Sequence, residues 1–318
     1  MASTLYRLAQ EYDGAELSKA LREFGFGDLL AEEPREAVSS LFDAIGYVGA
    51  VPAALQDVLL APLSQILGKD VADHSVVIPT SGARVAGSLE RNALNVRGLV
   101  IGSPCTATAM LVPVGAIDGI AWVRITDPSL LSSRLIAGLD PALAMTEVTV
   151  TGLPATVVLE AEPATLTWKA VVTAGRLALG YQIVGAVSRM IDLAVDHSRS
   201  RVQFGRPIGS FQAVRNRLAE AYVAREGAAS ALLQAWNADD QYLAGMLAKS
   251  LAGRAARIAA TQCQQVLAGV GFTAEHPFHR FLVRALVLDS LLGSAAELPS
   301  VIGTQLVLCG SIPRLVQL

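Results

Sequence analysis

The segment SRSRVQFGRPIGSFQAVRNRLAE, which begins at Ser198, carries charged and amide side chains at a turn between two helical patterns. A turn needs only the glycine and the proline at its corner, because glycine accepts positive φ and proline cannot continue a helix. Arg201 and Gln203 are therefore more than the turn requires, and a guanidinium group supplies fixed positive charge with paired donors. The alternative interpretation is a plain helix terminator, in which Phe204 packs in a bundle and the arginines are solvated.

A second polar and glycine-rich segment, QCQQVLAGVGFTAEHPFHR, begins at Gln262, about 60 residues after Arg201. It places Gln265 near the end of a helical pattern and Gly269 just beyond it. A glycine there lets another group approach the backbone closely. The alternative is an ordinary carboxyl-terminal helix cap, and Gly271 needs no role beyond that.

The histidines and cysteines do not form a metal-binding pattern. The four histidines make no HExxH, and His276 and His279 are expected at the surface or an interface. Cys105, Cys263 and Cys309 are widely spaced without CxxC, so neither a disulfide framework nor a metal cluster is expected, and a reducing cytoplasm fits best. The amino-terminal residues lack the basic start and apolar centre of a secretory signal.

Composition favours a chain that buries part of its surface against another chain. Hydrophobic residues make up 52% and charged residues 17% of the sequence, against roughly 25% charged in an average soluble domain. The formal net charge is -3, with basic residues scattered among acidic ones, which argues against a nucleic-acid ligand. No uninterrupted apolar run is long enough to cross a membrane. We therefore expect an oligomer with large apolar contacts and no membrane span.

Three regions follow one another along the chain. Residues 1–73 have the pattern of short helices, with Pro34 near one helix start. Residues 74–160 consist of β-branched runs separated by Gly, Pro and Asn, which predicts a reduced antiparallel β domain. Residues 161–318 return to a helical period in long segments joined by short turns. The expected fold is mainly α with a small β domain, ending in a long-helix bundle.

The ends of the long helices carry recognisable signals. Ser210 and either Asp239 or Asp240 are expected as amino-terminal caps, and Gly269 as a stop. The first long helix, which ends near Ser198, is apolar on nearly every side. It is therefore expected to be the buried helix of the bundle.

The order of helical region, small β domain and long-helix bundle resembles the acyl-CoA dehydrogenase family. The first segment is similar to the family pattern of Arg, Gln-Phe-Gly, Pro-Ile and Phe-Gln before a Leu-Ala-Glu helix, and the second is similar to its Gly-aromatic-Thr-x-Glu pattern. The resemblance implies an FAD held mainly by a neighbouring subunit. It assigns Arg201 to the phosphates, Gln203 and Phe204 to the adenosine side, and Gln265 with Gly269 to a close backbone approach.

The residues that correspond to the family's catalytic base are not carboxylates. Acyl-CoA dehydrogenation removes a proton from the α-carbon while a hydride leaves the β-carbon, so a carboxylate must face the substrate opposite the flavin. The family's base positions correspond here to Leu292 and, by our alignment, Trp168. Glu162 and Glu297 match only if the alignment shifts by more than a helical turn, so both are expected to be surface carboxylates. No catalytic residue is therefore assigned to this chain.

The β region also lacks the family's Thr-Glu-Pro-Gly-Ala-Gly-Ser segment, which contacts the flavin ring, and VVIPTSGARVAGS lies in its place. A chain that keeps the interface half of a flavin site but loses the base resembles the short subunit of heteromeric (α2β2) acyl-CoA dehydrogenases of actinobacterial steroid degradation. That resemblance implies a full-length partner chain that supplies the catalytic Glu, a bulky steroid-derived acyl-CoA, and an electron-transfer flavoprotein as acceptor. Two alternatives stay open: a non-catalytic structural subunit of the same fold, and a homo-oligomeric flavoenzyme of the superfamily with another substrate.

Overall fold

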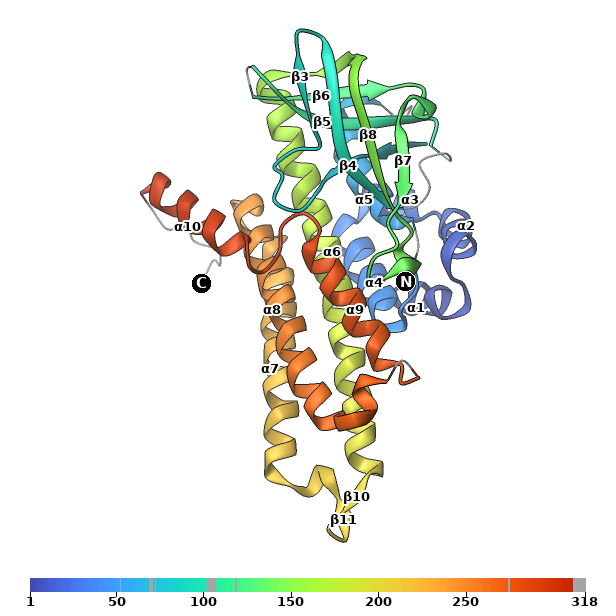
Figure 1. Ribbon diagram of the computed structural model, residues 1–318, viewed down its shortest axis with the longest axis vertical. Coiled ribbons are helices and arrows are strands. Elements are labelled where there is room, and N and C mark those ends of the chain that lie inside the picture. Colours follow the sequence, from blue (N-terminus) through green and yellow to red (C-terminus); the bar gives the residue numbers. More distant parts are fainter. Residues whose placement is uncertain are drawn as a thin grey trace.

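The computed structural model joins a long helical bundle to a β sheet and to a cluster of short helices (Figure 1). The sheet packs at one end of the bundle, the amino-terminal helices lie on one side, and α10 (Leu298–Cys309) projects from the other side. Cys105 lies outside the described residues. The structure describes residues 1–51, 53–68, 71, 73–101, 107–117, 119–273 and 275–310.

The amino-terminal helices begin and end where local sequence dictates. They are α1 (Ala2–Glu11), α2 (Gly14–Phe24), α3 (Phe26–Glu32), α4 (Pro34–Val48) and α5 (Ala54–Leu67). Asp13 accepts a hydrogen bond from the Gly14 N–H at 2.8 Å, which satisfies a donor at the start of α2. Gly25 and Gly49 end α2 and α4 with left-handed φ of +82° and +88°. Pro34 occupies the first turn of α4, as expected.

The described strands that precede α6 form one mixed sheet. They are β1 (His74–Val76), β2 (Ile78–Pro79), β3 (Gly87–Glu90), β4 (Ala93–Ile101), β5 (Ala109–Ala116), β6 (Gly119–Ile125), β7 (Ser132–Leu135), β8 (Met145–Pro154) and β9 (Thr156–Leu159). The order is β7-β8-β4-β3-β5-β6-β9, with β1 also on β5 and β2 also on β4. Most pairs are antiparallel, but β1–β5 and β3–β5 are parallel. The expected antiparallel β domain is therefore present, with two parallel pairs added where β5 lies beside β1 and β3.

The carboxyl-terminal region is a bundle of long helices, and the fold class expected from the sequence is confirmed. It comprises α6 (Ala161–Ser200), a hairpin of β10 (Val202–Gln203) and β11 (Arg206–Pro207), the short turn η5 (Ile208–Ser210), α7 (Gln212–Ala235), α8 (Gln241–Leu267), η6 (Ala268–Phe272), α9 (Phe278–Ser290) and α10. Asp240 caps α8 by accepting the Leu243 N–H at 3.0 Å. Ser210 is not the cap of α7, because it lies in η5. Gly269 does not end α8 either, since the residue after Leu267 is Ala268 with φ +53°.

The helix α6 is the buried axis of the bundle. It is long and apolar enough to cross a membrane by length and composition alone, and 89% of its most apolar window is buried inside the structure. It contacts α4, α5, α7, α8 and α9 as well as β6. Burial on nearly every side explains why its sequence lacks a polar face.

The amino-terminal cluster and the bundle are joined by a close helix crossing between α4 and α6. A Cβ atom on Gly46 would lie 2.1 Å from the Gln182 carbonyl oxygen, and one on Gly185 would lie 2.2 Å from the Asp43 carbonyl oxygen. Both separations are far below van der Waals contact, so only glycine allows the two backbones to meet here.

The helix α9 also ties the three regions together. Arg284 forms an ion pair with Asp140, from the loop after β7, and the two side chains are only 7% and 9% exposed. The Arg284 Nη1 also donates to the Ala50 carbonyl at 3.3 Å, and the Arg280 Nη2 donates to the Val48 carbonyl at 2.9 Å. The sheet and the α4–α5 connection are therefore fixed relative to the end of the chain that carries Leu292.

Candidate cofactor half-site

The first segment forms a tight hairpin at the end of the bundle farthest from the sheet (Figure 1). The strands β10 and β11 are antiparallel, with Gln203 opposite Arg206. The two turn residues, Phe204 and Gly205, have φ of +54° and +77°, as a two-residue type I′ turn requires. Glycine adopts this φ freely, whereas phenylalanine there costs about 1–2 kcal/mol.

The side chains of the hairpin are directed to solvent. Phe204 is 92% exposed, although its ring meets the Phe211 ring edge-on at 6.1 Å. Arg201 and Gln203 are also exposed, and Gln203 uses its amide only to donate to the Val202 carbonyl at 2.8 Å. Phe204 is therefore not packed in the bundle, which removes the plain helix-terminator interpretation for this residue.

The second segment lies at the same end of the bundle as the hairpin. The Arg217 Nη1 of α7 donates to the Gln262 Oε1 of α8 at 2.7 Å, and the Gln262 Nε2 donates to Glu220 at 2.9 Å. Because α7 and α8 run antiparallel, a residue three positions after Gln262 in α8 lies about 4.5 Å closer to the start of α7 than Gln262 does. Exposed Gln265 is therefore level with the first turn of α7, and Gly269 follows one turn later.

The two glycines of the second segment have different surroundings. A Cβ atom on Gly271 would lie 2.9 Å from the Leu267 Cβ, so internal packing accounts for this glycine. A Cβ atom on Gly269 would have no described atom within 4 Å. The chain's own packing therefore does not require glycine at 269, and the predicted close approach by another group stays a prediction.

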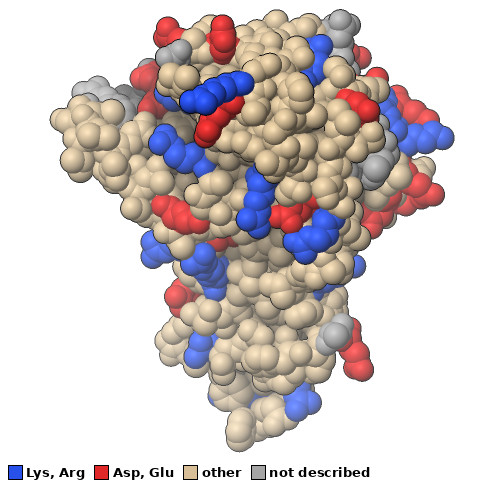
Figure 2. All heavy atoms as spheres, turned by 45° about the horizontal axis from the view of Figure 1, so that its top comes forward, with Lys and Arg blue, Asp and Glu red and all other residues tan. Residues whose placement is uncertain are grey.

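Positive charge gathers around the hairpin. On the face in Figure 2, basic and acidic residues are interspersed over the sheet and the adjoining bundle. Residues 195–220 contain only Asp196 and Glu220 as acids, against arginines at Arg199, Arg201, Arg206, Arg215 and Arg217. The hairpin end thus has the charge that a phosphate-containing group requires.

Leu292 is the residue predicted to correspond to the family's base. It lies at a bend after α9 with φ +55° and is 6% exposed. A Cβ atom on Gly175 of α6 would lie 2.5 Å from the Leu292 Cδ1 and 2.8 Å from the Leu59 Cδ2 of α5. The side chain at 292 is thus in apolar contact with two helices, and leucine there cannot accept a proton.

Two buried cations hold this bend by its main chain. The Arg176 Nε donates to the Leu292 carbonyl at 2.9 Å. The Lys249 ammonium is 0% exposed and donates to the carbonyls of Asp289 at 3.0 Å and Gly293 at 3.3 Å. Burial lowers the pKa of Lys249 to about 8, and the Asp289 carboxylate opposes that shift. The strained φ at Leu292 therefore persists because its neighbours fix it.

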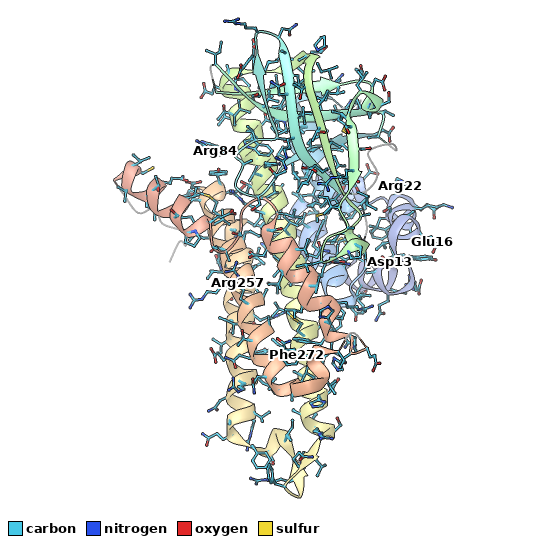
Figure 3. All side chains as sticks on the ribbon, in the orientation of Figure 1. Asp13, Glu16, Arg22, Arg84, Arg257 and Phe272 are labelled. Atoms are coloured by element: carbon cyan, nitrogen blue, oxygen red, sulfur yellow. The ribbon has the colours of Figure 1, made fainter. Side chains whose placement is uncertain are left out.

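The Asp289 carboxylate organises the chain after the bend. It accepts from the Arg257 Nη2 at 3.1 Å and from the Ala295 N–H at 3.0 Å, and it lies 3.8 Å from the Lys249 Nζ. Arg257, which is labelled in Figure 3, extends to this carboxylate from α8. A Cβ atom on Gly253 would lie 1.9 Å from the Asp289 Oδ1, so glycine is needed where this carboxylate meets α8.

The two carboxylates considered as substitutes for the base have other surroundings. The Glu297 Oε2 accepts from the Ser294 N–H at 3.0 Å, while the Ser294 hydroxyl accepts from the Glu297 N–H at 3.2 Å, which is a capping box. Glu297 also accepts from the Ser81 hydroxyl at 3.3 Å, and the hydrogen bond from the Ser294 backbone is the main reason its pKa is lowered. Glu162 is exposed in the first turn of α6. Glu297 is therefore an engaged structural carboxylate and not a free surface group.

Trp168 lies away from Leu292. Its ring packs against Trp122 of β6 with centroids 5.7 Å apart. The residue of α6 that faces Leu292 is Gly175, about 10 Å further along the helix axis. Neither Trp168 nor Gly175 offers a carboxylate.

Comparison with known proteins identifies the bundle. The family model described as acyl-CoA dehydrogenase, C-terminal domain, matches residues 167–306. This part of the chain belongs to the acyl-CoA dehydrogenase family. Acyl-CoA dehydrogenase IpdE2 of Mycolicibacterium smegmatis is 36% identical over 121 residues, which are 38% of this chain and 39% of that protein. The sequence match thus spans well under half of that relative.

Solved structures of the acyl-CoA dehydrogenase fold match nearly the whole chain. The ChsE4–ChsE5 complex from Mycobacterium tuberculosis has a TM-score of 0.76 at 24% identity and covers 98% of this chain and 92% of the matched one. A structure described as the Tcur3481–Tcur3483 steroid ACAD G363A variant has a TM-score of 0.78 at 18% identity, covering 97% and 98%. The fold is therefore that of the acyl-CoA dehydrogenases throughout, and the expected resemblance to that family is confirmed.

The structure brings the two predicted segments to one end of the bundle and keeps Leu292 at a distant bend. Sequence reasoning did not find Lys249 and Asp289, because a lysine within a helical pattern gives no sign that it is buried. It also assigned no role to Arg206. The register of the hairpin, which only the structure supplies, places Arg206 opposite Gln203.

Proposed function

We propose that this chain is the base-lacking subunit of a heteromeric FAD-dependent acyl-CoA dehydrogenase. The observation that carries the proposal is the contrast between an exposed donor set at one end of the bundle and an apolar Leu292 at the base position. The chain would cap an FAD shared with a partner, while the partner would supply the catalytic Glu. A cytoplasmic location is consistent with Cys263, which is buried as a free thiol.

The donors at the hairpin end fit the diphosphate and adenosine portion of FAD. Arg201 offers a guanidinium that forms no hydrogen bond or ion pair with any described residue. Gln203 and Gln265 are exposed amides, Phe204 is an exposed ring for stacking, and Gly269 leaves its backbone open. Fixed charge, amide donors and an aromatic face are the groups that bind a dinucleotide's diphosphate and base.

The reaction would form an α,β-double bond in an acyl-CoA. A proton would leave the α-carbon for the partner's carboxylate, and a hydride would leave the β-carbon. FAD, when bound, supplies the chemistry that accepts the hydride. Leu292 takes no part in proton transfer, because its buried side chain is apolar. A bulky steroid-derived acyl group is proposed on the likeness to the steroid ACAD structure, and an electron-transfer flavoprotein is the acceptor that the family implies.

The test is co-expression with a full-length acyl-CoA dehydrogenase-like chain encoded beside this one. The proposal expects a lone chain without bound flavin and a yellow complex with about one FAD per pair of unlike chains, measured by visible absorption and native mass. A yellow homo-oligomer of this chain alone would refute it in favour of a self-sufficient flavoenzyme. A complex without flavin would refute it in favour of a structural subunit.

Two substitutions test which of the two chains supplies the catalytic base. Changing the partner's catalytic Glu to Gln should abolish acyl-CoA oxidation with FAD still bound. Leu292→Glu in this chain should not restore it, because the family's flavin-ring segment is replaced here by VVIPTSGARVAGS. Recovery of activity with Leu292→Glu would contradict the proposed loss of function in this chain's own site.

A further inference from the structure

The hairpin presents a second arginine on the same face as Arg201. Residues opposite each other in an antiparallel ladder point to one face, and so do residues two apart on one strand. Gln203 is opposite Arg206, and the Ile208 N–H donates to the Arg201 carbonyl at 2.9 Å, which extends the same register by two positions. Arg201, Gln203 and Arg206 therefore share one face of the ribbon.

Arg206 is also held in place by a ring. Its guanidinium lies 4.2 Å from the centroid of Phe211, the residue that precedes α7. Stacking on an aromatic face restricts the side chain but leaves the N–H groups at the edge of the guanidinium free to donate. Arg206 is thus positioned without using its donors, and a ligand would meet a preorganised fork.

The other arginines of this region are already engaged. Arg199 lies 4.0 Å from Asp196, Arg215 donates to the Ser210 carbonyl at 2.8 Å, and Arg217 donates to Gln262 at 2.7 Å. Between residues 198 and 220, all of which the structure describes, Arg201 and Arg206 are the arginines whose guanidinium groups form no hydrogen bond or ion pair.

We propose that Arg206 is a second phosphate-binding residue of this half-site, acting with Arg201 on the diphosphate of the cofactor. The inference rests on the proposed function. A diphosphate carries two negative charges, and diagonal positions on a two-stranded ribbon lie about 7–8 Å apart, within reach of two arginine side chains that converge on one group. Phe211 would then be the positioning residue for Arg206.

The test compares FAD affinity among variants of the co-expressed complex. FAD is removed, added back in titration, and its dissociation constant is read from the change in flavin fluorescence at two salt concentrations. Arg206→Ala and Arg201→Ala should each weaken binding by about tenfold or more and reduce its salt dependence. Arg199→Ala is the matched control, because it removes an exposed arginine with a different partner, and it should stay within about twofold of the parent.

The outcomes separate the two claims. If Arg201→Ala weakens binding but Arg206→Ala behaves like Arg199→Ala, the proposal for Arg206 is wrong and the proposed function stands. If neither variant weakens binding, the FAD half-site itself is wrong. Should Arg206→Ala prevent assembly, Phe211→Leu keeps the charge and removes the stacking ring, and an unchanged FAD affinity for that variant would overturn the proposal.

Discussion

The buried ammonium of Lys249 should give the protein an unusual alkaline stability profile. Its folded-state pKa is about 8, because burial outweighs the Asp289 carboxylate, whereas the pKa of an exposed lysine is 10.5. Between these two values the unfolded chain binds a proton that the folded chain has released. The free energy of unfolding must then rise with pH across that interval. At about 1.4 kcal/mol per pH unit, the full interval corresponds to about 3 kcal/mol.

The assay is urea unfolding of the parent and of Lys249→Met at pH values from 7.5 to 10.5. Tyrosines and other lysines titrate in both proteins, so the difference between the two isolates residue 249. The free energy of unfolding of the parent minus that of Lys249→Met should increase by about 3 kcal/mol from the lowest to the highest pH. A difference that stays flat with pH would refute the reasoning, because it would mean that Lys249 keeps an ordinary pKa in the folded state.

Two further predictions follow from packing. Gly253→Ala should lower the free energy of unfolding by about 2 kcal/mol or more, because its Cβ would lie 1.9 Å from the Asp289 Oδ1. The control is Gly227→Ala in α7, where a Cβ would have no described atom within 4 Å. It should leave the free energy of unfolding unchanged or raise it by up to about 1 kcal/mol. The Cys263 thiol, which burial gives a pKa of about 12, should resist iodoacetamide in the folded protein, while exposed Cys309 reacts.

Urea unfolding midpoints test the glycine prediction, and alkylation tests the cysteine prediction. Equal urea midpoints for the two glycine variants would show that Asp289 moves away from α8 without penalty. For the cysteines, peptide mapping by mass spectrometry reports each site separately. Alkylation of Cys263 at the rate of Cys309 without denaturant would mean that the bundle opens around α8.

Local sequence signals predicted two helix starts correctly, but they did not predict the strand pairing of the sheet. Pro34 and Asp240 lie where the patterns predicted, because capping depends on residues one turn apart. The parallel pairing of β1 with β5 was not predictable in this way, since the two strands are more than 30 residues apart and pair through tertiary packing.

The candidate site was predicted in part. The hairpin corner follows from its glycine and proline, but the stacking of Arg206 on Phe211 depends on how the chain turns into α7. The burial of Lys249 depends on three helices meeting. Sequence periodicity describes one helix at a time, so contacts of this kind have no local signature.

The close crossing of α4 and α6 also bears on the order in which the chain can fold during synthesis. The chain between Gly46 and Gly185 includes the whole sheet, so α4 leaves the ribosome well over 100 residues before the segment of α6 that it must contact. At typical rates of 5–20 residues per second, this delay is roughly 7–28 s. Throughout that time α4 can pack on α1 and α3, but the face that meets α6 has no native partner, so the helix crossing forms late in synthesis.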